Sequence, residues 1–201
     1  MPPLNFIQWS GVAAILGGVV YAATLSLLGP LVRLLYSPSS PEDIPPILNY
    51  IGIIPVLLLI LGAMAAIVAL HTLQREHYGL LGALASLTSF VGAGLILLGG
   101  LLDLLGLAGE SSFYLGVYAL ISGALVTTVG LLTLGGVTTA ARVLPGWVGA
   151  LIILGSPPAV FLFAGLYEEL QSLVGVAWAL VGYALFRQAR VQQAQQLPQV
   201  R

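Results

Sequence analysis

Cysteine is absent from the 201 residues of this chain, and so is lysine. Without cysteine the chain forms no disulfide, thiolate metal site, iron–sulfur cluster or covalently attached c-type haem. The six basic residues are all arginines without a basic run, and the net charge is -1. The sequence therefore lacks the positive patch that binding to nucleic acid requires, and we exclude DNA and RNA as partners.

Charge of either sign is scarce. Charged residues make up 6% of the chain, hydrophobic residues make up 59%, and the mean hydropathy is +1.05. A soluble domain devotes about a quarter of its residues to charge so that water can hydrate its surface. The composition therefore predicts an integral membrane protein whose first partner is the lipid bilayer.

Six hydrophobic stretches approach or exceed the length that crosses a bilayer, because a helix needs about 20 apolar residues to span the hydrocarbon core. Charges, prolines or polar clusters separate them. We expect one all-α domain, residues 1–201, built as an integral membrane bundle of six transmembrane helices. The predicted spans are approximately 6–29, 47–70, 79–102, 113–136, 146–165 and 170–186.

The arginines predict the orientation, because basic residues near helix ends are retained in the cytoplasm. One side of the predicted bundle carries five arginines and a single acid, Glu76, whereas the other carries Arg33 and six acids. Both termini lie on the first side, which requires an even number of spans. We therefore expect a multipass protein of the cell membrane with both termini cytoplasmic. The five arginines are Arg75, Arg142, Arg187, Arg190 and Arg201.

The odd-numbered spans begin alike, with the segments 9–13, 80–84 and 147–151. In addition, Arg75 and Arg142 each stand four residues before a glycine, Gly79 and Gly146. These matches suit three parallel hairpin repeats, a construction known among membrane proteins. Chance alignment of helices rich in glycine and leucine is the alternative. The short connections and the Trp-x-Gly openings are similar to those of many small bacterial membrane proteins, a likeness of style that implies no activity.

Small residues recur at every fourth position on several predicted helices. Helices in lipid associate where small residues let their backbones come close, so we interpret these positions as helix contacts. They are Ala14, Gly18, Ala22 and Ser26 on the first span, Ala85, Ser89 and Ala93 on the third, and Ala119, Gly123 and Thr127 on the fourth.

Most charges need no functional explanation, because acids lie at the amino ends of predicted helices and arginines at the carboxyl ends, where the helix dipole favours each. Asp103 is the exception, since it lies near the carboxyl end of the third span. Arg33 is the only basic residue expected on that side. We predict a salt bridge between Asp103 and Arg33 that ties the first hairpin to the second. An exposed carboxylate at the lipid headgroups and a binding or proton site are the alternatives.

Gly155-Ser156-Pro157-Pro158 interrupts the fifth span. Each proline lacks an amide hydrogen and crowds the carbonyl four residues back, so the carbonyls of Ile153 and Leu154 lose their usual donors. One interpretation is a broken helix at membrane depth that lines the site of a transporter. The other is a kink whose free carbonyls are satisfied by a neighbouring helix or by Ser156.

The two histidines, His71 and His77, flank one short predicted connection at the water interface. This placement suits neither a b-type haem, whose axial histidines face each other at membrane depth, nor a zinc site on one helix. We expect them to anchor the interface beside Tyr78, and we interpret Trp178 in the sixth span as a packing residue. No catalytic residue, metal ligand or cofactor is predicted.

These observations favour a non-catalytic accessory or scaffold subunit of a larger membrane complex, whose partners are other membrane-protein subunits or further copies of this chain. The alternative is a small six-helix transporter or channel built around the broken fifth helix and Asp103. For that function we expect a polar cavity that reaches the midplane, whereas a solid core would contradict it. An intramembrane enzyme is least favoured, because no two titratable groups converge in depth.

Overall fold

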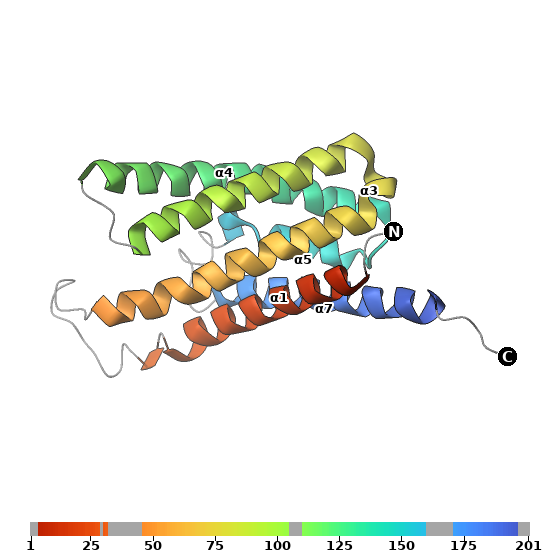
Figure 1. Ribbon diagram of the computed structural model, residues 1–201, viewed down its shortest axis with the longest axis horizontal. Helices are drawn as coiled ribbons and strands as arrows, with labels where there is room; N and C mark the ends of the chain where they lie inside the picture. The colour runs from red at the N-terminus through yellow and green to blue at the C-terminus, as the bar shows by residue number, and fades with distance from the viewer. Residues whose placement is uncertain (1–3, 29, 32–45, 105–109, 160–170, 197–201) are drawn as a thin grey trace.

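The computed structural model describes residues 4–28, 30–31, 46–104, 110–159 and 171–196, which are almost entirely helical (Figure 1). Four helical segments are long and apolar enough to cross a membrane: Asn5–Leu27, Ile53–Leu102, Tyr114–Ala141 and Ser172–Gln195. The protein is therefore an all-α chain suited to a membrane. Its elements are α1 (Leu4–Ala23), the π-helical η1 (Thr24–Leu28), α3 (Pro46–Leu104), α4 (Glu110–Ala141), α5 (Trp147–Leu154) and α7 (Ser172–Gln196).

The long element α3 consists of two helical arms that meet at Gly79. This residue has φ 56° and ψ -151°, a backbone conformation that is essentially restricted to glycine. The first arm (46–78) and the second arm (80–104) correspond to the second and third predicted spans. The predicted connection between those spans, 71–78, is itself helical, so the chain reverses at a single residue instead of through a loop.

The helices form two groups (Figure 1). The α1 group contains α1, the first arm of α3 and α7; the α4 group contains the second arm of α3, α4 and α5. Within each group, glycines bring backbones into contact. A Cβ atom at Gly18 would collide with the backbone of Gly175 and Ala179, and one at Gly92 would collide with Thr127. The predicted stripes that include Gly18 and Thr127 are therefore contacts within this chain.

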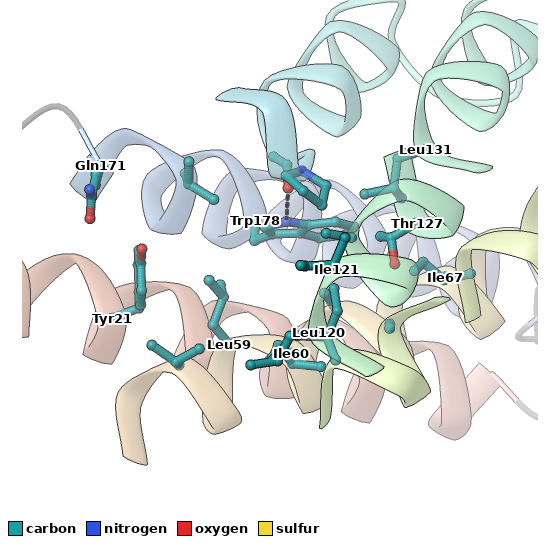
Figure 2. Close-up of a pocket in the computed structure, with 18 residues that line it drawn as sticks. Tyr21, Leu59, Ile60, Ile67, Leu120, Ile121, Thr127, Leu131, Gln171 and Trp178 are labelled. Atoms are coloured by element: carbon teal, nitrogen blue, oxygen red, sulfur yellow. Dashed lines mark hydrogen bonds between the residues drawn. The ribbon is translucent and has the colours of Figure 1, made fainter. Parts of the chain in front are cut away.

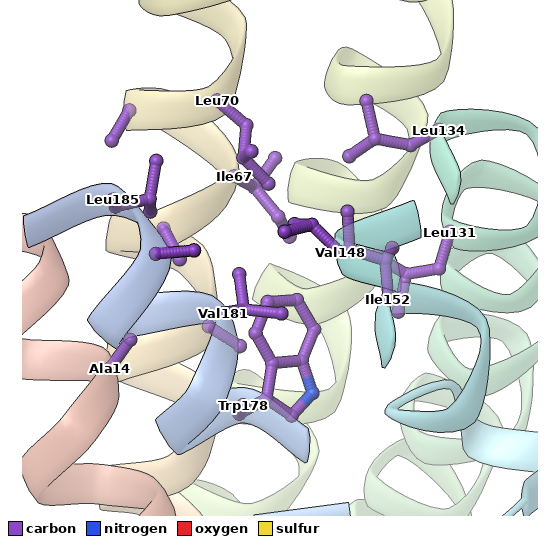
Figure 3. Close-up of a cluster of buried hydrophobic side chains, with 14 of the residues drawn as sticks. Ala14, Ile67, Leu70, Leu131, Leu134, Val148, Ile152, Trp178, Val181 and Leu185 are labelled. Atoms are coloured by element: carbon purple, nitrogen blue, oxygen red, sulfur yellow. The ribbon is translucent and has the colours of Figure 1, made fainter. Parts of the chain in front are cut away.

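The two groups meet along a surface that we call the seam. Branched side chains from both groups fill one part of it and are at most 2% exposed (Figure 3). Because lipid is as apolar as these side chains, their close van der Waals packing is what holds the groups together. They are Ile67 and Leu70 of the first arm, Val181 and Leu185 of α7, Leu131 and Leu134 of α4, and Val148 and Ile152 of α5.

The start of α1, the turn at Gly79 and the end of α7 lie at one end of the bundle (Figure 1). There Gln8 Nε2 donates a hydrogen bond of 2.7 Å to Gln193 Oε1, which joins α1 to α7. The segments at this end carry four exposed arginines, in keeping with the basic side that the sequence predicts. The cytoplasmic orientation of this end stays a prediction. The arginines are Arg75, Arg142, Arg187 and Arg190.

The two turns that align in the sequence have different backbones. In α3 the positive φ falls on Gly79, whereas between α4 and α5 it falls on Arg142, with φ 54°. Gly146, the partner of Gly79 in the alignment, is right-handed with φ -57° and ψ -27°. The matching offset in sequence therefore does not produce matching turns, and the hairpin repeat gains no support here.

Candidate functional site

The fifth span breaks where its prolines indicate. Gly155 and Ser156 are non-helical, and a short helical turn follows at 157–159. The backbone N–H and the hydroxyl of Ser156 both donate to the Ile153 carbonyl, at 3.1 and 2.6 Å. Ser156 thus replaces the amide donor that Pro157 lacks. The sequence predicts that either Ser156 or a neighbouring helix satisfies the carbonyls freed by the prolines, and this bond is the first of the two.

A neighbouring helix supplies the second contact at the break. Trp178 of α7 is 3% exposed, and its Nε1 donates to the Gly155 carbonyl oxygen at 3.0 Å. A Cβ atom at Gly155 would lie 2.5 Å from Nε1, so this approach requires glycine. Sequence reasoning took Trp178 for a packing residue only. Its indole N–H was the available signal, because a buried tryptophan usually finds an acceptor.

The break borders a cleft of about 490 Å³ between the two groups (Figure 2). This volume lies within the range of ~300–1,000 Å³ that is typical of small-molecule sites. None of its 18 lining residues is charged. They are Tyr21, Val56, Leu59, Ile60, Ala63, Ile67, Ala93, Ile96, Leu120, Ile121, Ala124, Thr127, Leu131, Gly155, Pro157, Gln171, Val174 and Trp178.

The cleft is partly open, and the exposed lining residues show where. Val56 of the first arm is 39% exposed, and Leu120 and Ile121 of α4 are 37% and 56% exposed. All three belong to segments that are long and apolar enough to cross a membrane. The mouth of the cleft therefore lies between the first arm of α3 and α4, where the surface faces hydrocarbon in a bilayer.

Polar groups gather at one end of the cleft. Tyr21 of α1 and Gln171, the residue before α7, point their polar atoms toward each other there (Figure 2). At the opposite end lie Ile67 and Leu131, which belong to the filled part of the seam. The hydroxyl of Thr127 lies against Gly92 of α3 and has no hydrogen-bond partner among the described residues. Tyr21 and Gln171 thus make one end of the cleft polar, whereas the polar side chain at the other end, Thr127, keeps its hydroxyl oxygen buried against Gly92.

Three of the residues singled out from the sequence lie at the break. Pro157 lines the cleft, Ser156 is buried and caps α5, and Pro158 is exposed. Arg33 lies outside the described residues. Asp103 is in the last turn of the second arm, and its side chain also lies outside the described part of the structure. The salt bridge between them stays a prediction.

A second polar cluster joins the two arms of α3 behind their turn. His71 Nδ1 lies 3.0 Å from the Tyr78 hydroxyl oxygen, which lies 3.3 Å from Ser86 Oγ. Gly82 gives the Tyr78 ring room, because a Cβ atom at residue 82 would collide with it. The sequence predicts both histidines beside Tyr78; the structure brings His71 to it and leaves His77 exposed.

A further buried polar pair connects α4 to the first arm of α3 across the seam. Thr138 of α4 donates from Oγ1 to Oε1 of Gln74 on the first arm at 3.2 Å, and both residues are fully buried. The Gln74 Nε2 atom has no hydrogen-bond partner among the described residues. Sequence reasoning missed this pair, because it placed Gln74 in a connection exposed to water rather than in a helix.

Tyr21 is the only titratable side chain among the described residues that line the cleft, and in the described ranges no three His, Asp or Glu residues form a metal-binding group. Comparison of the chain with protein-family models, with curated proteins and with solved structures finds no match. The functional argument therefore rests on the residues of this chain.

Proposed function

We propose that the protein is a small, non-catalytic, multipass membrane protein that binds an apolar molecule from the bilayer in the cleft beside the broken fifth helix. The observation that carries the proposal is a cleft of about 490 Å³ that has no charged side chain among its described lining residues. Its mouth, between the first arm of α3 and α4, faces the hydrocarbon of the membrane. Of the functions considered from the sequence, this proposal corresponds to the transporter, with an apolar molecule as its cargo.

The character of the lining distinguishes this proposal from an ion pathway. A pore for ions replaces the hydration shell with rings of carbonyl oxygens or charged side chains. The cleft offers two polar side chains at one end, Tyr21 and Gln171, while the Gly155 carbonyl at its wall is already bonded to Trp178. A polar cavity that reaches the midplane was the expectation for a transporter or channel, but the described lining of this cleft is mostly apolar. An apolar cleft favours a hydrocarbon ligand instead.

Trp178 provides a direct test, because it lines the cleft and is buried. A variant with Trp9→Phe and Trp147→Phe retains Trp178 as its single tryptophan. We reconstitute this variant into phosphatidylcholine vesicles with or without a bromoalkane dissolved in the bilayer, since bromine quenches indole fluorescence at short range. We expect the bromoalkane to quench Trp178.

Quenching must depend on entry into the cleft. Ala63→Leu narrows the cleft, so it is expected to reduce the quenching. Ala150→Leu makes the same change on an exposed face of α5 and is expected to leave the quenching unchanged. If Trp178 is unquenched by the bromoalkane, or if Ala63→Leu and Ala150→Leu behave alike, the proposal is wrong.

The accessory or scaffold subunit is the second candidate. Most glycines of the two groups contact another helix of this chain, but a Cβ atom at Gly136 of α4 would meet nothing within 4 Å. Tyr118, on the same helix, is 69% exposed. An open glycine and an exposed tyrosine on one helix favour a partner helix packed against α4, from another subunit or from a second copy.

Purification in mild detergent with chemical cross-linking tests this candidate. We expect a partner, or a second copy, that is lost from the Gly136→Leu variant while the melting temperature is unchanged. A monomer without any cross-linked partner contradicts the accessory function and leaves the cleft proposal intact.

The orientation is also a proposal: both termini cytoplasmic in the cell membrane, with the arginine-bearing end inside. A reporter fused to the carboxyl terminus is expected to be active on the cytoplasmic side. Activity of that fusion on the outer side contradicts the orientation.

A further inference from the structure

The two ends of the cleft differ in polarity, and this difference narrows the class of ligand. We infer that the cleft takes an uncharged, single-chain amphiphile, with a small hydrogen-bonding head at Tyr21 and Gln171 and a hydrocarbon chain that runs past Trp178. The inference rests on the proposed function, because it requires that an apolar molecule occupies the cleft. It adds the head group, the number of chains and the direction in which the ligand lies.

The length of the cleft matches one leaflet. Val56 and Ile67 line it eleven positions apart on the first arm of α3, which corresponds to about 16 Å at 1.5 Å per residue. The hydrocarbon core of a bilayer is about 30 Å thick. A cleft of that length takes a chain that reaches from one interface to the middle of the membrane. Its volume of about 490 Å³ lies in the lower half of the range for ligand sites, which suits one chain rather than two.

The polar end suits a hydroxyl or carbonyl head. A tyrosine hydroxyl both donates and accepts, and a glutamine side chain has an amide donor and a carbonyl acceptor. Their polar atoms face each other across the end of the cleft (Figure 2). Among the described residues that line the cleft none is charged, so these residues offer no counter-charge to an ionised head. Burying an unpaired charge is far more costly than burying a hydrogen-bonded neutral group, so the head is uncharged.

The positions of Tyr21 and Gln171 also set the direction. Tyr21 lies in the last turn of α1, and Gln171 precedes Ser172, the first residue of α7. The helical path of α1 continues through η1, so Tyr21 lies six residues before the end of the apolar segment Asn5–Leu27, while Gln171 immediately precedes the apolar segment Ser172–Gln195. The polar end of the cleft is therefore the end nearer to a membrane interface. The Tyr21 ring packs against Gly175, where a Cβ atom would lie 3.0 Å from the ring Cδ1 atom. The deeper wall carries two other donors, but the Trp178 N–H is already bonded to Gly155 and the Thr127 hydroxyl oxygen is buried against Gly92.

The test uses the single-tryptophan protein in vesicles of unbrominated phosphatidylcholine, with brominated single-chain probes added. The probes are a monoacylglycerol brominated near the chain end, the same compound brominated near the head, a bromoalkane of equal length and a brominated alkyl sulfate. We expect the chain-end monoacylglycerol to quench Trp178 more than the near-head compound. We expect it to bind more tightly than the bromoalkane, and the alkyl sulfate to bind most weakly.

Substitutions at the polar end separate head recognition from chain binding. Tyr21→Phe and Gln171→Leu are each expected to weaken binding of the monoacylglycerol by about three- to tenfold, the effect of losing one hydrogen bond. Binding of the bromoalkane should be unchanged. Tyr183→Phe makes the matched change at an exposed tyrosine of α7 and should affect neither probe. Melting temperatures are measured alongside, and either polar-end variant suffices if the other fails to fold.

The outcomes distinguish the two proposals. If neither the bromoalkane nor the monoacylglycerol quenches Trp178, the cleft admits no chain, and the proposed function fails together with this inference. If the two probes bind equally and both polar-end variants leave that ratio unchanged, the cleft binds a chain but does not recognise the head, and the inference alone is overturned. Tightest binding of the alkyl sulfate overturns the inference as well.

Discussion

The contacts within each helix group differ from the contacts across the seam. Within the α1 group, glycines such as Gly18 and Gly175 bring two backbones together and leave no room for a side chain. Across the seam, branched side chains pack against one another in one part and leave a cleft in the other. Backbone contacts through glycine are close along the whole helix, whereas large side chains fill space only where their shapes match. Free volume is therefore concentrated between the groups, where we propose that a ligand binds.

Four features among the described residues connect the two groups. The chain crosses at Gly79, the indole of Trp178 bonds to Gly155, Thr138 bonds to Gln74, and the Tyr78 hydroxyl bonds to Ser86. Substitutions within a group and at the first three connections test whether the groups are rigid bodies that meet at a weaker surface.

Gly18→Leu, within the α1 group, is expected to have the largest effect. Its added side chain would meet the Gly175 carbonyl and the Ala179 backbone nitrogen, the latter 2.7 Å from a Cβ atom. Because neither backbone can move aside, α1 and α7 must separate, at a cost at or above the upper end of the ~1–3 kcal/mol that overpacking usually costs. The melting temperature in detergent measures this loss. Gly136→Leu, in open space, is the matched control and should not change it.

Gly79→Ala tests the covalent connection between the groups. Alanine is strained at φ 56° and ψ -151°, so we expect a loss of about 1–3 kcal/mol in unfolding free energy. Gly146→Ala is the control, because Gly146 has φ -57° and a Cβ atom there would make only an ordinary contact of 3.9 Å with Thr139. We expect no loss at residue 146. An equal response at both glycines would mean that the two turns are equivalent, which would favour the hairpin repeat.

Trp178→Phe removes the hydrogen bond that connects α7 to the break in the fifth span. The buried Gly155 carbonyl then loses its indole donor, at an expected cost of about 1–3 kcal/mol. Thermal unfolding in detergent measures the change. Trp147→Phe, at a half-exposed position on α5, should have little effect. Similar melting temperatures for the two variants would show that the indole only fills space.

Thr138→Val and Thr127→Val are the same substitution on α4 with different expected signs. Thr138 bonds to Gln74 across the seam, and such bonds in membranes are worth about 0.6 kcal/mol on average, so its loss should slightly destabilise the protein. The Thr127 hydroxyl is buried without a hydrogen-bond partner among the described residues, so its removal should be neutral or stabilising. Unfolding in a mixed-detergent series measures both. Destabilisation by Thr127→Val would reveal a bond to that hydroxyl.

The helix ends show what a hydrophobicity signal measures. The sixth predicted span ends at 186, but α7 continues to Gln196 through a stretch rich in glutamine and arginine. The fourth predicted span likewise ends at 136, whereas α4 continues to Ala141. An apolar run reports the part of a helix that lies in lipid, while the helix itself continues as long as its backbone hydrogen bonds do. The apolar cores of these helices were predictable, and their ends were not.

The candidate site shows the same division. The break, and the hydrogen bond from Ser156 to a freed carbonyl, could be predicted from the local chemistry of the prolines and Ser156 alone. The partner of Gly155, the indole of Trp178, lies 23 residues away in the sequence, and no pattern in the chain connects the two. The cleft depends on residues from α1, α3, α4, the break and α7 at once, so it could not be predicted from any one of them.

The sequence by itself determined that the protein is helical and suited to a membrane, since long apolar runs with little charge leave the backbone no stable alternative in lipid. It also determined where the fifth span breaks, because proline lacks the amide hydrogen that a helix needs. Only the tertiary structure decided that the chain reverses at one glycine, that the small-residue stripes are used within the chain, and that the break borders an apolar cleft. These features depend on which helix faces meet and on how well their side chains fit. Both are determined by residues that are distant in the sequence and come together only when the helices pack.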